Sequence, residues 1–304
     1  MKEAQVQVSI LIVNWNGKKY LRACLESIQQ KVTVPFEVIV VDNNSGDGSA
    51  DEVEAHFQWV KLVRSEKNLG FAGGNNLGAR HASGKYLLLL NYDTMLQTDI
   101  VDTVAIAEAD PKVGAVGALM FYGDGSLQPS AFRFPTPSRL WRIASLAYSS
   151  DTPIDRIGGL PVRRCDFVEG SFLLTSAAVW RAVNGMDESN FMYCEDADYG
   201  RSISNAGYFS VQSQSVRYTH FCGYNHARMS YLFSGFRRYH RKFSGPLTRA
   251  HAEFVLRTGL LLRLPWYWLK GLRGDEQGRI ALQYALRVNR NWKNTGVDSF
   301  RHEA

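Results

Sequence analysis

The sequence contains few cysteines, and they form no motif. Four are present, far apart and without a C-x-x-C pair, at Cys24, Cys165, Cys194 and Cys222. This spacing argues against a zinc cluster and gives no sign of a disulfide framework. The first apolar run, residues 8–13, is too short for a signal peptide and ends at Asn14. We therefore expect reduced thiols, a cytoplasmic protein and no export signal.

Charge is unevenly distributed along the chain. Its 304 residues are 45% hydrophobic and 21% charged, which is ordinary for a globular protein with room for one large domain and an appendage. From Arg217 onward, 16 lysines and arginines face 5 aspartates and glutamates, whereas the preceding part has 19 against 24. Such a basic tail can meet nucleic acid, anionic lipid or a phosphorylated substrate.

Strand and helix patterns alternate from the start of the chain, which indicates an α/β protein built on a βαβ sheet. The expected strands are residues 6–14, 38–42, 60–64, 86–91 and 113–121, and the expected helices are 20–28 and 72–82. Between residues 123 and 168 five prolines interrupt the pattern, so we expect an irregular segment that folds over a ligand site. A strand at 168–175, a helix near 176–183 and a helix beginning at Glu195 should follow.

A helical, basic and aromatic tail begins at Arg228. Its apolar segment 254–272 is a poor transmembrane span, because polar or helix-breaking residues interrupt it at Arg257, Arg263, Pro265 and Lys270. Neighbouring aromatic residues favour instead a helix that lies in a membrane interface: Trp266, Tyr267 and Trp268. The alternative is a hydrophobic helix packed on the main domain.

Carboxylates follow three apolar runs that have the pattern of buried strands. Asp42 and Asp93 end the first two, and Glu195-Asp196 comes after the third. Open α/β sheets bind ligands at the carboxyl ends of their strands, so we expect these acids to converge on one crevice. Gathered acids repel one another unless a metal ion, a base donor or a hydroxyl lies between them. The pattern therefore predicts a site for an anionic, metal-bound nucleotide.

Each acid also has a simpler interpretation. Asp42 opens the turn Asp42-Asn-Asn-Ser-Gly-Asp-Gly-Ser49, where it could accept the N3–H of a pyrimidine or belong only to a polar turn. Asp93, in Asn91-Tyr-Asp93, could bind a divalent cation that keeps substrate phosphates in its shell. Alternatively, Asp93 caps the helix that begins near Thr98.

The third acidic element and a late histidine complete the candidate set. One acid of Glu195-Asp-Ala-Asp198 could remove a proton from a hydroxyl nucleophile while the others satisfy the helix start, and we choose Asp196 as the base. His220 is a metal ligand, a diphosphate donor or a structural residue. The glycine-rich stretch 68–78 could present free N–H groups to a ligand at the entrance to a helix, although it is neither a Walker loop nor a dinucleotide fingerprint.

Together, these motifs resemble the inverting GT-A glycosyltransferases of family 2, and most of all the bacterial rhamnosyltransferases of cell-surface polysaccharide synthesis. The resemblance covers about residues 6–245 and rests on motifs in the family's order: Ile12-Val-Asn-Trp-Asn-Gly17, residues 41–49, Asn68-Leu-Gly-Phe-Ala-Gly-Gly-Asn75, Leu90-Asn-Tyr-Asp93, Val168-Glu-Gly-Ser171, Glu195-Asp-Ala-Asp198 and His220. Two departures are visible. The usual D-x-D begins here with Asn91, and Tyr92 stands where the subgroup often has proline.

The resemblance implies a GT-A fold, with a mostly parallel nucleotide-binding sheet flanked by helices and a helical basic extension. It implies a catalytic domain over residues 1–227, divided into a nucleotide-binding half (1–121) and an acceptor-binding half (122–227), with the extension at 228–304. Asp196 with Glu195 would be catalytic, and Asp93 with His220 would hold Mg²⁺ or Mn²⁺. Nucleotide-sugar contacts fall on six residues: Asn14, Asn16, Asp42, Asn75, Asn91 and Gly170. Arg228 is a further candidate for the leaving diphosphate.

The implied reaction is transfer of a sugar, with inversion, to a hydroxyl of a glycan or of a polyprenyl-diphosphate-linked acceptor. L-rhamnose from dTDP-rhamnose is favoured as the donor. The alternatives are a UDP donor of GlcNAc, galactose or galactofuranose, and a non-catalytic nucleotide-sugar or polyanion binding protein. A nucleotidyltransferase is disfavoured, because the loop after the first strand lacks a glycine-rich, arginine-bearing form. We expect work at the inner face of the cytoplasmic membrane, with an anionic membrane surface or a second copy as partners and no role for nucleic acid.

Overall fold

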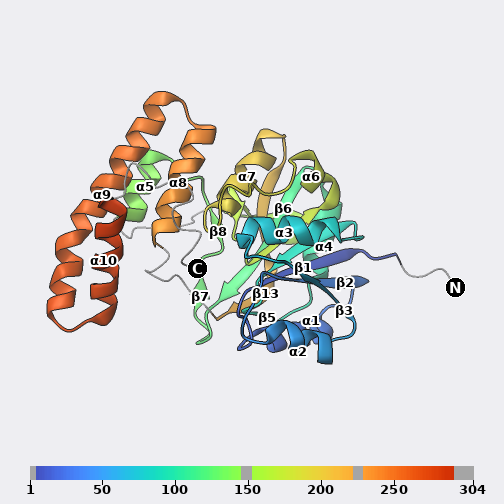
Figure 1. Cartoon of the computed structure of the whole chain (residues 1–304). Coiled ribbons are helices and arrows are strands. Elements are labelled where there is room, and N and C mark those ends of the chain that lie inside the picture. The colour runs from blue at the N-terminus through green and yellow to red at the C-terminus, as the bar shows by residue number, and fades with distance from the viewer. Residues whose placement is uncertain (1–4, 145–152, 222–228, 291–304) are drawn as a thin grey trace. The chain divides into compact units, whose positions relative to one another are not determined.

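A computed structural model describes residues 5–144, 153–221 and 229–290 (Figure 1). The chain divides into two compact units. The described part of the first unit comprises residues 5–133, 153–189 and 195–221, and that of the second comprises 134–144, 190–194 and 229–290. The first unit contains all the strands described, whereas the second is helical.

The first unit is built on an eleven-stranded sheet and a separate pair of short strands. Its strands are β1 (Val8–Asn14), β2 (Phe36–Asp42), β3 (Val60–Arg64), β4 (Tyr86–Leu90), β5 (Thr94–Leu96), β6 (Val113–Phe121), β7 (Leu127–Gln128), β8 (Ala131–Phe132), β9 (Ile154–Ile157), β10 (Leu160–Cys165), β11 (Phe167–Val168), β12 (Phe172–Ser176) and β13 (Phe209–His220). The main order is β3-β2-β1-β4-β12-β6-β13-β10-β9, with β5 beside β13 and β7 beside β6. β8 pairs with β11.

The part of this sheet formed by β1 to β4 is parallel, as predicted. β1 pairs in parallel with β2 and β4, and β2 pairs in parallel with β3. The register places Asn14 opposite Asp42, at the carboxyl ends of neighbouring strands. Beyond β4 the sheet is mixed, because β12 runs antiparallel to β4 and β10 runs antiparallel to β13. The α/β fold class with a parallel first half is therefore confirmed.

Helices cover both faces of the sheet (Figure 1). Those of the first unit are α1 (Leu21–Lys31), α2 (Ser49–His56), α3 (Gly70–Arg80), α4 (Val101–Ala109), α6 (Ala177–Ala182) and α7 (Glu195–Asn205). Successive strand residues point to opposite faces. Ile10 and Ile12 accordingly pack with α1, α2 and α4, whereas Leu11 packs with α3, α6 and α7. Apolar runs without polar alternation thus mark strands buried on both sides.

Gly70 begins α3 with a φ of 72°, and the other glycines of this stretch lie within the helix. A Cβ at Gly74 would lie 2.6 Å from Val13 Cγ1, and a Cβ at Gly78 would lie 3.3 Å from Val41 Cγ2. The stretch 68–78 therefore has a glycine at the helix entrance, as expected, and further glycines inside the helix, where they serve packing. Its glycines bring the helix close to β1 and β2.

Regular structure also occurs within residues 123–168, where we expected an irregular segment. β9 and β10 form a hairpin that extends one edge of the sheet. Gly158 and Gly159 connect the two strands with φ angles of 56° and 82°. Two successive positive φ angles match the tight turn that fits the twist of a hairpin, and glycine adopts them without strain.

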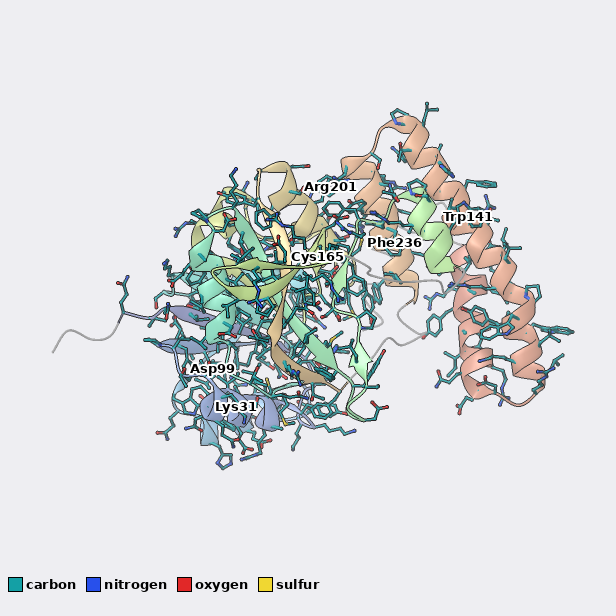
Figure 2. All side chains as sticks on the ribbon, turned by 180° about the vertical axis from the view of Figure 1, so that it is seen from behind. Lys31, Asp99, Trp141, Cys165, Arg201 and Phe236 are labelled. Carbon is teal, nitrogen blue, oxygen red and sulfur yellow. The ribbon has the colours of Figure 1, made fainter. Side chains whose placement is uncertain are left out.

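The second unit is a cluster of helices: α5 (Pro137–Ala144), α8 (Met229–Phe243), α9 (Pro246–Leu272) and α10 (Glu276–Arg290). Its core contains Leu256, Leu260 and Tyr267 of α9, with Ala281 and Ala285 of α10. Trp141 and Phe236 pack against this core as partly buried rings (Figure 2). No helix within the described ranges is both long and apolar enough to cross a membrane.

We predict that Gly74→Ala destabilises the protein although alanine favours helix, because the new methyl group would collide with the side chain of Val13. Overpacking of this kind costs about 1–3 kcal/mol in the free energy of unfolding, which denaturant titration measures. Gly46→Ala is the control, since a Cβ there would meet no atom within 4 Å. Equal stability of the Gly74 variant and the wild type would contradict the close packing of α3.

Candidate active site

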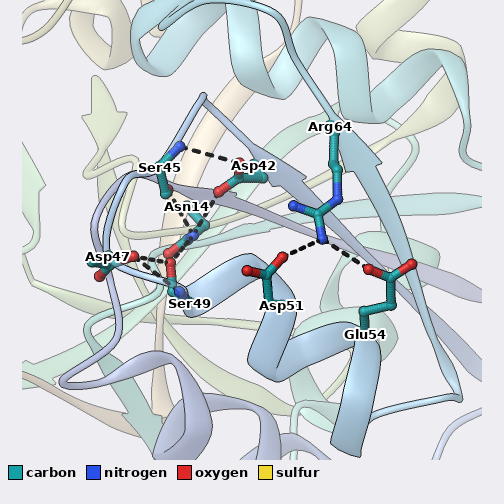
Figure 3. Close-up of polar contacts among 8 residues, drawn as sticks. All are labelled: Asn14, Asp42, Ser45, Asp47, Ser49, Asp51, Glu54 and Arg64. Carbon is teal, nitrogen blue, oxygen red and sulfur yellow. Dashed lines mark hydrogen bonds and ion pairs between the residues drawn. The ribbon is translucent and has the colours of Figure 1, made fainter.

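A buried asparagine organises the loop that follows β2 (Figure 3). Asn14, fully buried at the end of β1, donates from Nδ2 to Asp42 Oδ1 at 3.0 Å, to Ser45 Oγ at 3.1 Å and to Ser49 Oγ at 2.8 Å. Asp47 Oδ1 in turn accepts hydrogen bonds from Ser49. One amide thus fixes the end of β2 against the start of α2.

Asp42 lies at the centre of this loop. Its Oδ1 accepts from Asn14, and its Oδ2 accepts from the backbone N–H of Ser45 at 3.1 Å. Asn16 supports the same turn, because its backbone N–H donates to Ser45 Oγ at 3.0 Å and its Oδ1 accepts from Gly46 N at 2.9 Å. A carboxylate has about four acceptor positions. Asp42 therefore keeps capacity for a further donor such as the N–H of a base.

The predicted contact Asn75 lies in the middle of α3 and is buried. Its Nδ2 donates to the carbonyl oxygen of Phe71 at 3.0 Å, within the same helix. Asn43, which follows Asp42, donates from its side chain to the carbonyl oxygen of Gly70 at 3.1 Å. The start of α3 is thus joined to the nucleotide loop through Asn43.

Strand pairing brings Asp93 and His220 together. β5 begins directly after Asp93 and pairs with the end of β13, where His220 lies opposite Thr94. Phe221 N donates to the carbonyl oxygen of Asp93 at 3.0 Å. His220 Nε2 consequently lies 3.3 Å from Asp93 Oδ1, and both side chains are buried. The alternative that Asp93 caps α4 is wrong, because Asp99 Oδ1 accepts from the N–H groups of Ile100 and Val101.

The charge state of His220 follows from this pairing. Burial alone would lower its pKa, but the carboxylates of Asp93 and Glu169 outweigh that effect and raise the pKa above its usual value. The raised pKa favours an imidazolium facing Asp93, and such a group can donate to a diphosphate oxygen.

The donor set of this pair fits a divalent cation. Apart from the ion pair between the two residues, Asp93 Oδ1 and His220 Nδ1 are buried atoms for which the described residues provide no hydrogen-bond partner. In the described residues, no three histidine, cysteine or acidic side chains gather closely enough to enclose a metal ion. Mg²⁺ is commonly held by one or two carboxylates together with substrate phosphates and water, and imidazole suits transition metals. Asp93 and His220 therefore fit a cation whose remaining ligands come from the substrate.

Asp196 and Glu195 have different surroundings although they are neighbours at the start of α7. Burial raises the pKa of Asp196 to about 6, against hydrogen bonds from the backbone of Ala197 and Gly170 that lower it. Glu195 is more deeply buried, and desolvation together with Asp196 raises its pKa well above the usual value. Among the described residues its Oε2 has no hydrogen-bond partner. Burial thus favours the neutral form of Glu195, while backbone N–H groups support the ionised form of Asp196.

Glu169 is an acidic residue of this site that the sequence analysis did not select. Burial raises its pKa to about 7, against an opposing effect of His220, and Asp196 and Asp93 raise it further. Glu169 thus lies within electrostatic reach of the predicted base and of the Asp93–His220 pair. The available signal was the motif Val168-Glu-Gly-Ser171, in which only Gly170 was chosen.

Gly170, Asn91 and Tyr92 connect the parts of the site. A Cβ at Gly170 would lie 2.9 Å from the Phe71 ring and 4.0 Å from Asp196 Cβ. Asn91 N donates to the carbonyl oxygen of Ser171 at 3.1 Å, which ties the strand tip to this loop. A Cβ at Gly17 would lie 2.2 Å from Asn14 Oδ1 and 2.7 Å from the Tyr92 ring. The Tyr92 ring therefore lies between the nucleotide loop and Asp93, while Arg228 falls outside the described residues.

The parallel nucleotide-binding half, its polar edge and the mixed remainder of the sheet define a GT-A glycosyltransferase. The chain belongs to glycosyl transferase family 2, whose sequence profile matches residues 9–171.

Relatives extend over most of the chain. A Mycobacterium tuberculosis protein, N-acetylglucosaminyl-diphospho-decaprenol L-rhamnosyltransferase, is 25% identical over 312 residues, which cover 90% of this chain and 96% of that protein. Rhamnosyltransferase WbbL of Escherichia coli is 28% identical over 245 residues, covering 77% and 90% respectively. Among solved structures, a mannosyltransferase from Pyrobaculum calidifontis in complex with GDP-Man and Mn²⁺ matches with a TM-score of 0.58 at 19% identity, covering 94% of this chain and 88% of that one. This last likeness supports the fold.

We predict that Asp93→Asn weakens Mn²⁺ binding in the presence of dTDP, because it removes the charged oxygen donor of the pair. Changes that merely touch a metal ligand cost about 10-fold to 100-fold in affinity, so loss of the ligand itself should cost at least as much. Electron paramagnetic resonance of free Mn²⁺ measures the affinity. The control is Asp124→Asn, the same chemical change in an exposed turn. Wild-type affinity in the Asp93 variant would remove this residue from the metal site.

Proposed function

We propose that this protein transfers L-rhamnose from dTDP-rhamnose, with inversion, to a sugar hydroxyl of a polyprenyl-diphosphate-linked acceptor. One observation supports it most: Asp196, a carboxylate with a pKa of about 6, and the paired Asp93 and His220 all act electrostatically on the same buried residue, Glu169. One base and one diphosphate site are what a single displacement requires. The choice of sugar and acceptor follows the relatives named rhamnosyltransferases.

Donor binding would begin at the loop after β2. Asp42 would accept the N3–H of thymine, and the turn of Asn16 and Gly46 would surround the nucleoside. Asn14 is fully buried, so its part would be to orient Asp42 and the loop rather than to touch the nucleotide. Asn75, Asn91 and Gly170 would border the sugar and diphosphate from α3, the end of β4 and the loop before β12.

The leaving diphosphate would be bound by the Asp93–His220 pair. When Mg²⁺ or Mn²⁺ is bound there by Asp93 and His220, it supplies positive charge for the departing phosphate oxygens. His220, as an imidazolium or as a ligand, would hold the diphosphate beside the acid cluster. Asp93 fixes the position of the histidine through the contact of 3.3 Å.

Asp196 would act as the general base. The acceptor oxygen attacks the anomeric carbon, the bond from that carbon to the diphosphate breaks, and the diphosphate leaves with the electron pair while Asp196 takes the acceptor proton. A base is most effective when its pKa lies near the working pH, and Asp196 meets this condition. Burial and the neighbouring Asp196 raise the pKa of Glu195 well above its usual value, which favours the protonated form, and that form cannot accept the proton.

The test of this function is a turnover assay with dTDP-rhamnose, Mn²⁺ and N-acetylglucosamine linked to a short polyprenyl diphosphate. Mass spectrometry should show the acceptor with one added deoxyhexose, together with released dTDP. If transfer occurs only from UDP-sugars, the donor is a UDP-sugar and not dTDP-rhamnose. Binding of dTDP without any product from either donor class would identify a nucleotide-sugar binding protein instead.

We predict that Asp196→Asn lowers kcat by about 10²-fold to 10⁴-fold, the usual contribution of a positioned base. In the wild type, kcat should rise with pH through about 6, because the carboxylate must lose its proton before it can accept one. The variant should lack this rise and bind donor normally. Glu195→Gln is the neighbouring control and should keep the pH dependence. If Glu195→Gln loses it and Asp196→Asn retains it, the base is Glu195.

A further inference from the structure

Helix α9 exposes an unusual amount of apolar surface. Sixteen large hydrophobic side chains are strongly exposed in the described residues, and eight of them belong to α9: Leu247, Phe254, Leu261, Leu262, Trp266, Trp268, Leu269 and Leu272. Several are open to a large extent, with exposed fractions of 88% for Leu247, 68% for Leu262 and 66% for Leu272. Contiguous exposed apolar surface of this kind marks an interaction site more often than chance.

Most of these residues share one side of the helix, which we call the α9 stripe. Leu247, Phe254, Leu261 and Trp268 recur every seven residues, and Leu262, Leu269 and Leu272 fall beside them in a helix of 3.6 residues per turn. The other side of α9 carries Ala252, Leu256, Leu260 and Tyr267, which are buried in the core of the helical unit. Packing within this unit therefore leaves the stripe uncovered.

The charge around the α9 stripe indicates whether a second copy of the protein or a lipid surface covers it. From Arg237 to Arg290 the sequence has 12 lysines and arginines against 3 acidic residues. Arg257, on the side of Phe254 and Leu261, and Arg273, next to Leu272, are exposed. Two copies of so basic a unit would repel each other, whereas anionic lipid would attract it by about 1 kcal/mol for each cation near the surface.

The aromatic residues point to the same occupant. Trp266 and Trp268 are about half exposed, and Lys270 Nζ lies 4.2 Å above the Trp266 ring. Tryptophan is enriched at the level of lipid headgroups, where its ring is partly apolar and partly hydrated. Tyr267, expected from the sequence to join this group, is buried and belongs to the core.

We infer that α9 lies flat on an anionic membrane surface, with the α9 stripe inserted among the acyl chains and the flanking arginines among the headgroups. This position would hold the enzyme at the surface in which a polyprenyl-linked acceptor resides. The inference goes beyond the proposed transfer reaction and does not depend on it, because adsorption to lipid requires neither donor nor acceptor. The strength of such adsorption grows with the apolar area buried in the interface and with the attraction of nearby cations to anionic lipid.

The test is flotation of the intact chain with vesicles of phosphatidylglycerol and phosphatidylcholine at low salt. The wild type should float with these vesicles and much less with vesicles of phosphatidylcholine alone. Leu262→Glu and Leu269→Glu should each reduce partitioning about tenfold or more, since burying one leucine contributes about 1.5–3 kcal/mol. Leu127→Glu is the matched control, because it is the same substitution at a residue 61% exposed outside α9, and it should float like the wild type.

Circular dichroism and thermal unfolding of each variant check that the helical unit remains folded. Two outcomes would overturn the inference. One is a folded Leu262→Glu protein that floats as well as the wild type. The other is a wild type that stays with the buffer and sediments as a dimer that Leu262→Glu dissociates, which would assign the α9 stripe to a second copy. Failure of the turnover assay alone would leave the flotation result intact and would count against the reaction only.

Discussion

The repulsion among desolvated carboxylates at one edge of the sheet constrains the whole catalytic unit. Asp93, Glu169 and the neighbouring pair of Glu195 and Asp196 come from three different segments, yet each affects the ionisation of another. Burying acids together costs free energy unless they are protonated, hydrogen-bonded or neutralised. Backbone N–H groups stabilise the charge of Asp196, His220 faces Asp93, and burial favours the neutral form of Glu195. Hydrogen bonding, ion pairing and burial in the neutral form thus make Asp196, Asp93 and Glu195 chemically different from one another.

The parallel half of the fold follows from local patterns, and that is why the sequence predicts it. Continuous runs such as Val38 to Val41 can be buried only in a strand covered on both faces, and acids that follow such runs must lie at the same edge. β3 and β6 were predicted with the bounds that the structure has. Asn14, Asp42, Asp93 and His220 could be chosen from the motifs because strand ends and family order both select them.

The features that the sequence did not predict depend on contacts between distant segments. Such contacts leave little trace in the local pattern of residues. The β9–β10 hairpin has only short exposed strands around Gly158 and Gly159, so nothing in its hydrophobic pattern distinguishes it from a loop. Glu169 gains its importance from Asp93, Asp196 and His220, none of which is near it in sequence. The difference between Asp196 and Glu195 likewise comes from burial in three dimensions. Tyr267 was placed with its neighbours Trp266 and Trp268, yet helical periodicity turns it into the core.

The pairing of β5 with β13 affects the order in which the protein folds during its synthesis. Asp93 leaves the ribosome long before His220, and only the closing of this non-local ladder brings their side chains into contact. Contacts between such distant segments form late, because the loop between them must first lose its conformational freedom. The nucleotide loop of Asn14 and Asp42, by contrast, joins strands that are neighbours in the chain. A nascent chain would therefore order the edge formed by Asn14 and Asp42 before the pair of Asp93 and His220, which comes together only when the sheet is complete.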